Sequence, residues 1–265
     1  MENYEAFKAE ILKMTHIDLS SYKEKQMRRR LESLAVKHHC NDFSEYIKLL
    51  KTDSAIFDEF INFMTINVSE FFRNPDQWEL LIQQFIPELI KSSGRNLKIW
   101  SAACSTGDEP YSLVMALSEH MELSRIHILA TDLDKTVISQ AKDGLYSEKS
   151  IANLPDKYIQ KYFTKIGSSY QISDEIKKRV EFRQHNLLAD PYPDHCNLIV
   201  CRNVLIYFTE EAKHEVYEKF YKSLADQGIL FIGSTEQVMD YRKIGYKRLT
   251  SFFYMKDPQS EMNDC

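Results

Sequence analysis

A change of hydrophobic period near Gly94 constrains this sequence more than any other feature. Before it, apolar residues recur at the three- and four-residue spacing of amphipathic helices, and residues 1–66 contain no glycine. After it, short apolar runs alternate with helical stretches, which is the pattern of a doubly wound parallel sheet. The 265 residues therefore predict a small all-α domain followed by a larger α/β domain.

The N-terminal domain, residues 1–66, is predicted to be a bundle of four short helices. The apolar residues that share a face in each helix are Phe7, Ile11 and Met14; Met27, Leu31, Leu34 and Ala35; Phe43, Ile47 and Leu50; and Ile56, Phe57, Phe60, Ile61 and Met64. Residues 67–94 are predicted to be a linker and the first helix of the larger domain. Asn74 would cap this helix, Pro75 would occupy its first position and Gln77 would complete a capping box.

The larger domain is expected to span residues 95–257, followed by a tail at 258–265. Its predicted strands are 97–100, 128–131, 180–182, 197–200 and 229–232, and its predicted helices are 109–122, 136–142 and 209–225. A last strand at 249–254 would pair antiparallel beside 229–232. Residues 145–180 interrupt the alternation, and an inserted hairpin with strands near 162–164 and 169–172 is expected there.

Composition excludes several classes of protein. The net charge of −5 disfavours a globally basic nucleic-acid binder. No apolar run approaches the ~18 residues that cross a bilayer, and the acidic, amphipathic start is unlike a secretory signal. The five cysteines are odd in number and include no CxxC pair, so neither a disulfide framework nor a zinc site is expected. We therefore expect a soluble cytoplasmic protein without a metal.

One stretch of the N-terminal domain departs from the acidic balance. Residues 20–40 hold six Lys and Arg residues against two Glu residues. A basic helix of this kind is either a solvated face or a docking surface for an acidic partner, and composition alone leaves both open.

The carboxyl ends of the predicted strands are the expected ligand site, because open α/β sheets bind ligands there. Residues 103–112 follow the first strand and carry one glycine and two acids, Asp108 and Glu109. A dinucleotide pyrophosphate requires several glycines in such a loop, yet the whole chain has only seven. The acids repel phosphate and favour a ligand with an amino group and a sulfonium over NAD or ATP. The alternative is that they only complement the helix dipole.

Polar residues mark the other strand ends. Asp132 is placed to accept hydrogen bonds from ribose hydroxyls, although Asp is also a common helix cap. Asn186 could contact an adenine edge. Arg202 and Asn203 interrupt an apolar run and need partners if they are buried, which favours a binding site over pure packing. The segment 67–73 lies between the domains and is either a wall of this site or a plain linker.

Five segments together resemble the chemotaxis receptor methyltransferases, the CheR family. They are NVSEFFR (67–73), SAACSTGDEPYS (101–112), ATDLD (130–134), HNLL (185–188) and CRNVLIYF (201–208). The resemblance covers about residues 5–257 and implies methylation of chemoreceptor glutamates with S-adenosyl-L-methionine, leaving S-adenosyl-L-homocysteine. It also implies a Rossmann-like methyltransferase domain with a small inserted β-subdomain, preceded by an all-α domain.

The resemblance assigns roles by position. The implied cofactor-binding residues are Asn67, Ser69, Arg73, Glu109, Asp132, Asn186, Leu187, Arg202 and Asn203. Arg73 and Tyr207 would lie nearest the transferred methyl group and act as catalytic residues. The implied receptor-docking residues are Lys23, Lys25, Arg28, Arg29 and Arg30. The implied partner is the cytoplasmic helical bundle of a chemoreceptor. The protein is expected to act as a monomer that neither binds nucleic acid nor inserts into a membrane. Two conservative departures from the family pattern are Ser69, often Thr, and Asp108, commonly Glu.

Three other functions remain as alternatives. Residues 190–193, Asp-Pro-Tyr-Pro, superficially resemble a motif of DNA amino-methyltransferases, but they precede the strand at 197–200 instead of following it, so a proline-containing turn is the better interpretation. A methyltransferase for a small molecule would not need a basic helical domain. A non-catalytic receptor adaptor with the same fold would not need Arg73, Glu109, Asp132 and Tyr207.

Overall fold

The computed structural model describes residues 1–258, so the predicted tail lies outside the described residues except for Pro258. The N-terminal domain has α1 (Tyr4–Thr15), η1 (Leu19–Ser21), α2 (Glu24–Lys37), α3 (Phe43–Thr52) and α4 (Ser54–Thr65). These elements confirm the four predicted helices. Their shared face is aromatic, since Phe7 contacts the rings of Phe43, Tyr46 and Phe60 and all four residues are at most 1% exposed.

The linker helix begins at Pro75 and ends before Gly94, as predicted. It consists of α5 (Pro75–Leu80), the π-helical turn η2 (Leu81–Phe85) and α6 (Ile86–Ser93). The wide turn precedes Pro87, which cannot donate a helical hydrogen bond. The predicted capping box is wrong, because the side-chain oxygens of Asn74 and Gln77 instead accept hydrogen bonds from Arg202 at 3.1 and 2.9 Å.

The α/β domain is built on a seven-stranded sheet in the order β6-β2-β1-β7-β8-β10-β9 within residues 1–258. Its strands are β1 (Ile99–Ala102), β2 (Ile128–Asp132), β6 (Val180–Gln184), β7 (Cys196–Cys201), β8 (Leu224–Ile232), β9 (Tyr246–Arg248) and β10 (Phe253–Lys256). Its other helices are α7 (Asp108–Leu117), η3 (Leu123–Arg125), α8 (Lys135–Asp143), η4 (Leu205–Tyr207), α11 (Glu210–Ser223) and α12 (Tyr241–Ile244). The first five strands in this order are parallel, and β10 is antiparallel to β8 and β9.

Most predicted elements are confirmed, with shifted ends. Helix α7 stops at Leu117 instead of residue 122, where the Ser118 hydroxyl donates to the carbonyl of Met115. The predicted last strand is two short strands joined by a turn at 249–252, and β10 pairs with β8 as expected.

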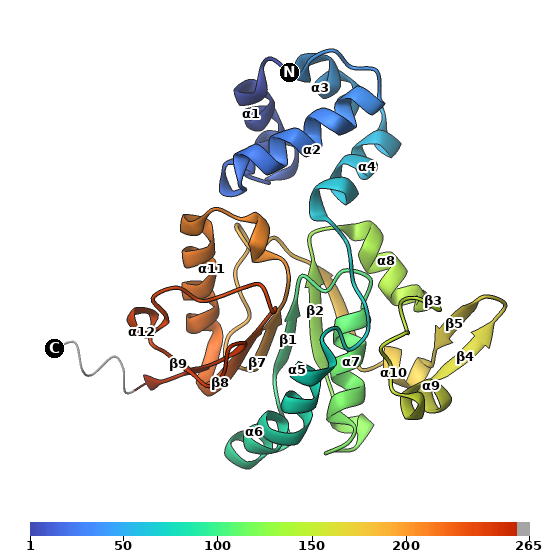
Figure 1. The fold of residues 1–265 in the computed structure, drawn as a ribbon, viewed down its shortest axis with the longest axis vertical. Helices are drawn as coiled ribbons and strands as arrows, with labels where there is room; N and C mark the ends of the chain where they lie inside the picture. Colours follow the sequence, from blue (N-terminus) through green and yellow to red (C-terminus); the bar gives the residue numbers. More distant parts are fainter. Residues whose placement is uncertain (259–265) are drawn as a thin grey trace.

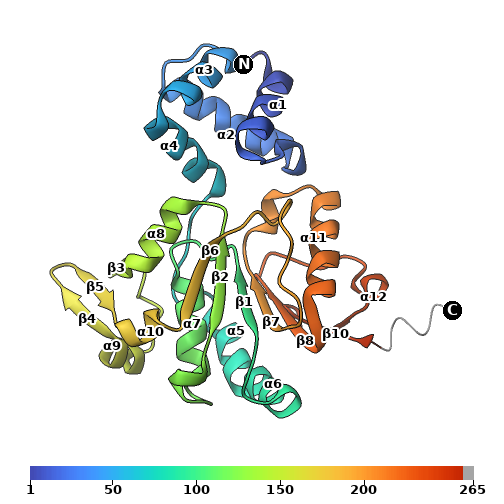
Figure 2. The ribbon, with the colours of Figure 1, turned by 180° about the vertical axis from the view of Figure 1, so that it is seen from behind.

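Alternate residues of the strands bury opposite faces of the sheet. Trp100, Ile199 and Leu230 face one apolar cluster that includes α11 and continues into the core of the helical domain. Leu198 and Phe231 face a second cluster with α5, α6 and α7. Figures 1 and 2 show these helices on opposite sides of the sheet, with the helical domain above its upper edge.

The insertion contains a second, three-stranded sheet in the order β3-β5-β4. It comprises β3 (Leu145–Ser147), α9 (Asp156–Tyr162), β4 (Phe163–Ile166), β5 (Ser169–Ile172) and α10 (Asp174–Lys177), which confirms the predicted hairpin. Residues 190–193 form an irregular connection before β7, as the turn interpretation expects.

Backbone hydrogen bonds join the helical domain to the segment after β7. Tyr22 and Phe208 form an isolated antiparallel bridge, Lys23 N donates to Tyr207 O and Thr209 N donates to Ser21 O, both at 2.9 Å. The helical domain is therefore held over the carboxyl ends of the parallel strands. Across residues 1–258 no helix combines the length and apolar character that a membrane span requires.

Candidate functional site

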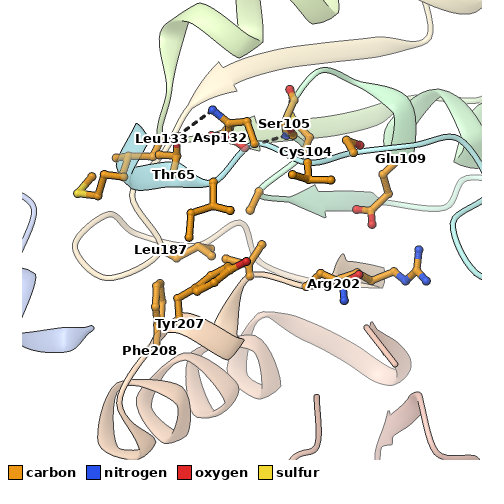
Figure 3. A pocket seen from close by; sticks show the side chains of 18 of the residues that line it. Thr65, Cys104, Ser105, Glu109, Asp132, Leu133, Leu187, Arg202, Tyr207 and Phe208 are labelled. Carbon is orange, nitrogen blue, oxygen red and sulfur yellow. Dashed lines mark hydrogen bonds between the residues drawn. The ribbon is translucent and has the colours of Figure 1, made fainter. Parts of the chain in front are cut away.

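The structure contains a cleft between the helical domain, the linker and the carboxyl ends of β1, β2, β6 and β7. All ten residues expected to bind the cofactor or act in catalysis line it: Asn67, Ser69, Arg73, Glu109, Asp132, Asn186, Leu187, Arg202, Asn203 and Tyr207. In Figure 3, Ser105, Asp132 and Glu109 lie along one wall, and Leu187, Tyr207 and Arg202 lie along the other.

The loop after β1 has the left-handed backbone that a tight ligand loop requires. Ala103, Ser105 and Gly107 have φ values of 64°, 49° and 88°. Only glycine fits at 107, because an added Cβ would lie 2.9 Å from the Cβ of Ala141 and 3.1 Å from the Tyr146 hydroxyl oxygen. That hydroxyl donates to Thr106 O at 2.8 Å, so the loop is also fixed from the insertion side.

Glu109 and Asp108 begin α7 beneath this loop. Burial raises the pKa of Glu109 to about 7, although Arg202 and a hydrogen bond from the Ser101 hydroxyl oppose the shift. Burial likewise raises the pKa of Asp108 to about 6. Glu109 lines the cleft, and its carboxyl group ionises more readily beside a positive charge, which supports the predicted preference for a cationic ligand.

Asp132 ends β2 and shapes the neighbouring loop. Its carboxylate accepts from Ser105 N at 2.8 Å and from Asp134 N at 3.0 Å. Burial raises its pKa to about 6. Both bonds fix the carboxylate at the cleft wall, where remaining lone pairs can accept from a ligand hydroxyl.

The linker is bound to the end of β2 instead of being a free connection. Asn67 Nδ2 donates to Asp134 Oδ2 at 3.0 Å and to Thr65 Oγ1 at 2.8 Å. Asn62 Nδ2 donates to the same Asp134 oxygen at 3.2 Å. The side chain of Asn67 thus contributes to the cleft while it also joins the two domains.

Arg73 lies between two residues with left-handed backbone, Phe72 (φ 47°) and Asn74 (φ 60°). The buried ring of Phe72 and a hydrogen bond from Phe72 N to Ser112 Oγ at 3.1 Å hold this turn. Among the residues that the structure describes, the Arg73 guanidinium has only distant partners, Val68 O at 3.4 Å and Glu70 Oε1 at 3.9 Å. It is therefore free to orient toward a ligand.

Arg202 is buried and holds the backbone of Arg73 in place. Besides the oxygens of Asn74 and Gln77, its Nη2 donates to the carbonyl of Arg73 at 2.7 Å. Its guanidinium lies over the ring of Phe231 at 4.6 Å. Burial lowers its pKa against the opposing effect of Glu109. Arg202, which is buried, thus has side-chain partners, as expected, whereas Asn203 is half-buried.

The Asn186 side chain, which was expected to contact adenine, makes hydrogen bonds within the protein. Its Nδ2 donates to His16 O at 3.1 Å, and its Oδ1 accepts from Leu188 N at 2.9 Å. The amide is largely occupied within the protein, so its contribution to the cleft is chiefly one of shape.

Several buried polar atoms around the cleft have no hydrogen-bond partner within residues 1–258. They are Ser105 Oγ, His185 Nδ1, Arg202 Nε and Asn203 Oδ1. Buried polar atoms without partners are costly, so donors and acceptors are expected from a ligand or solvent in the cleft. Together with the carboxylates, they suit S-adenosylmethionine, which carries positive groups, hydroxyls and an adenine. Within residues 1–258, no group of three or more His, Cys, Asp and Glu side chains could hold a metal.

Four residues around the site were not identified from the sequence. Tyr22 lines the cleft from the helical domain, Gln77 accepts from Arg202, and Asp134 anchors the linker. Glu236 lies behind Asn203 and accepts four backbone N–H bonds. In the sequence, Gln77 was assigned only to a helix cap and Asp134 stood only within the ATDLD segment (130–134), whereas no local pattern marked Tyr22 or Glu236.

The five expected docking residues do not form one free basic surface. Lys25 and Arg29 are exposed and Lys23 is partly exposed. Arg28 instead donates to Met1 O and to Glu32, and Arg30 donates to Phe63 O and lies over the Phe63 ring. Arg28 and Arg30 therefore also contribute to packing within the helical domain, and the docking role of the five residues stays a prediction.

Comparison with known proteins agrees with this geometry. The family described as "CheR methyltransferase, SAM binding domain" matches residues 67–251, and "CheR methyltransferase, all-alpha domain" matches residues 2–65. A "Chemotaxis protein methyltransferase" of Listeria innocua is 45% identical, over 91% of this chain and 92% of its own length. Proteins of the same name are 34% identical in Borreliella burgdorferi, over 87% and 86%, and 33% identical in Escherichia coli, over 78% and 73%.

Proposed function

The chain belongs to the CheR methyltransferase family, and we propose from this premise that it methylates glutamate side chains of chemoreceptors to methyl esters. It is a methyltransferase that uses S-adenosylmethionine, and its relatives are named as methyltransferases of chemotaxis, which supports a chemoreceptor as the substrate. The observation that supports the proposal best is the cleft that gathers all ten expected site residues, the acids Glu109 and Asp132 among them.

When bound, S-adenosylmethionine supplies an electrophilic methyl group on a sulfonium. Glu109 would hold its amino group, and Asp132 would accept from its ribose hydroxyls. Arg202 and Asn203 would close the cleft, Asn67 and Ser69 would line it from the linker, and Leu187 with Asn186 would border the adenine. The contacts within the protein support these roles, since they fix Glu109 and Asp132 at the wall before any ligand arrives.

The acceptor glutamate needs no general base, because a carboxylate with an ordinary pKa near ~4.3 is already an anion at neutral pH. Charge disappears as the anion attacks a cationic donor, so a cleft that excludes water favours the reaction. A tight clamp on the carboxylate would stabilise the ground state more than the transition state. The weak internal contacts of Arg73 support an orienting role, with Tyr207 positioning the reacting groups.

The partner would be the Glu-rich cytoplasmic helical bundle of a chemoreceptor, met by a monomer in the cytoplasm. The exposed Lys25 and Arg29, with the partly exposed Lys23, support such docking. These residues adjoin the bridge between Tyr22 and Phe208, beside the cleft.

The experiment is transfer of tritiated methyl groups to purified chemoreceptor membranes, followed by release of base-labile methanol. Base-labile label in the receptor band is expected. Calorimetric binding of S-adenosylmethionine without any transfer to receptors would instead favour a methyltransferase for another substrate. Absence of binding would favour a non-catalytic adaptor.

A further inference from the structure

Glu236 is a buried carboxylate behind the cleft that receives four backbone donors. Its Oε2 accepts from Asn203 N at 2.7 Å and Gly233 N at 2.8 Å, and its Oε1 accepts from Val204 N at 3.0 Å and Leu205 N at 2.9 Å. The residue is 8% exposed. A carboxylate has about four lone-pair sites, so this one is saturated by N–H groups.

Three of these donors belong to the turn that carries cleft residues. Asn203 has a φ of 60°, a left-handed backbone that a non-glycine residue adopts only where its surroundings enforce it. Asn203 lines the cleft with a buried Oδ1 that has no partner in the described part of the chain, and η4 then places Tyr207 in the same cleft. Glu236 therefore fixes the backbone from which both side chains project.

The space around Gly233 also shows how closely the Glu236 carboxylate approaches the backbone of Asn203. A Cβ at Gly233 would lie 2.7 Å from Glu236 Oε2 and 2.8 Å from Asn203 N. Glu236 N also donates to Gly233 O at 3.1 Å, which closes a short turn around the carboxylate. The missing side chain at 233 thus makes room for the bond between Glu236 and Asn203.

We propose that Glu236 is a positioning residue for the methyl transfer, acting through the backbone of residues 203–205 to present Asn203 and Tyr207 to the cleft. This role rests on the proposed function. Glu236 does not line the cleft itself, and its effect on the reaction is therefore indirect.

The test is Glu236→Gln, which keeps the size of the side chain but puts an NH₂ group against backbone donors. Amides 203–205 should exchange hydrogen about tenfold faster, because a bond to a charged acceptor is lost. The Kd for S-adenosylhomocysteine should rise about tenfold and kcat with receptor should fall about tenfold, since small displacements are costly in an oriented site. Gly233→Ala, which keeps the charge, should give the same pattern and replaces Glu236→Gln if that variant fails to fold.

The matched control is Glu119→Gln. Glu119 also receives two side-chain donors, Lys157 and Tyr158, but it does not line the cleft. Its loss should lower stability and leave Kd and kcat within about twofold, because separated sites act independently. Unchanged exchange at 203–205, or faster exchange with unchanged Kd and kcat, would overturn the positioning role. Normal binding of S-adenosylhomocysteine by the wild type without receptor methylation would instead refute the proposed function, while exchange and Kd still test Glu236.

Discussion

The amide of Asn67 donates a hydrogen bond to the carboxylate of Asp134 at 3.0 Å, and this bond joins the linker to the end of β2. Asp134 is 1% exposed and also caps α8 through Thr136 N at 2.7 Å. One carboxylate therefore sets both the start of a helix and the position of the segment that leads to Arg73.

Asp134→Ala should lower the free energy of unfolding by about 2 kcal/mol, since a helix cap and buried hydrogen bonds are lost together. The Kd for S-adenosylhomocysteine should rise about tenfold because the linker wall loosens. Urea unfolding and calorimetry measure the two effects.

Asp42→Ala is the control for this variant, because Asp42 caps α3 through Glu45 N at 2.9 Å and does not line the cleft. It should cost about 1 kcal/mol and leave the Kd unchanged. An equal loss of affinity in both variants would show that general stability, and not the linker contact, controls binding.

Binding of the cofactor should depend on pH through Glu109. Burial raises the pKa of this carboxyl to about 7, so the ligand-free protein favours the protonated form at pH 6. Glu109 would hold the positively charged amino group that S-adenosylhomocysteine shares with S-adenosylmethionine, and this group favours the ionised carboxylate. The Kd for S-adenosylhomocysteine should therefore fall about tenfold from pH 6 to pH 8, with proton release. Calorimetry in buffers of different ionisation enthalpy measures both quantities.

Glu109→Gln should remove this part of the pH dependence. The raised pKa means that protonated Glu109 stabilises the ligand-free fold fully below its ordinary pKa, and that this stability is lost as pH rises through about 7. Thermal unfolding of the variant should accordingly be less sensitive to pH between 6 and 8. A variant with the wild-type pH profile would exclude Glu109 as the titrating group.

Arg73→Ala should reduce turnover far more than cofactor binding. Its guanidinium has only distant partners within residues 1–258, so its removal should cost little stability, whereas lost orientation should lower kcat about 100-fold. Single-turnover methylation and calorimetry with S-adenosylhomocysteine separate the two. Arg95→Ala, an exposed arginine outside the cleft, is the matched control. Unchanged turnover in the Arg73 variant would refute the assignment.

The sequence predicted the structural features that depend on local residue patterns. Hydrophobic period predicted the four N-terminal helices and the strand–helix alternation, because each buries one stripe or face. The loop after β1 was recognisable from its single glycine and two acids. The sequence did not predict contacts between distant segments. Arg202 donates to the side chains of Asn74 and Gln77, which were expected to cap a helix. Glu236, which follows the C-terminal end of β8, accepts from the backbone of Asn203, which follows β7.

In the basic stretch at residues 20–40, too, the sequence could not show which side chains contact distant parts of the protein. A count of charges cannot distinguish Arg30, which donates to the carbonyl of Phe63 on α4, from Arg29, which is exposed. Reversing Arg28, Arg29 and Arg30 together would therefore confound docking with folding, since the first and third support the helical bundle.

Reversal of the two exposed charges, Lys25→Glu with Arg29→Glu, isolates docking. The KM for receptor should rise about tenfold and the effect should weaken at high salt, because exposed charges act through a screened field. The Kd for S-adenosylhomocysteine and the melting temperature should stay unchanged. Lys48→Glu with Lys222→Glu makes the same change in net charge at exposed positions on α3 and α11, and this control should leave KM unaltered. If both double variants raised KM equally, net charge would explain the effect and α2 would have no specific role in docking.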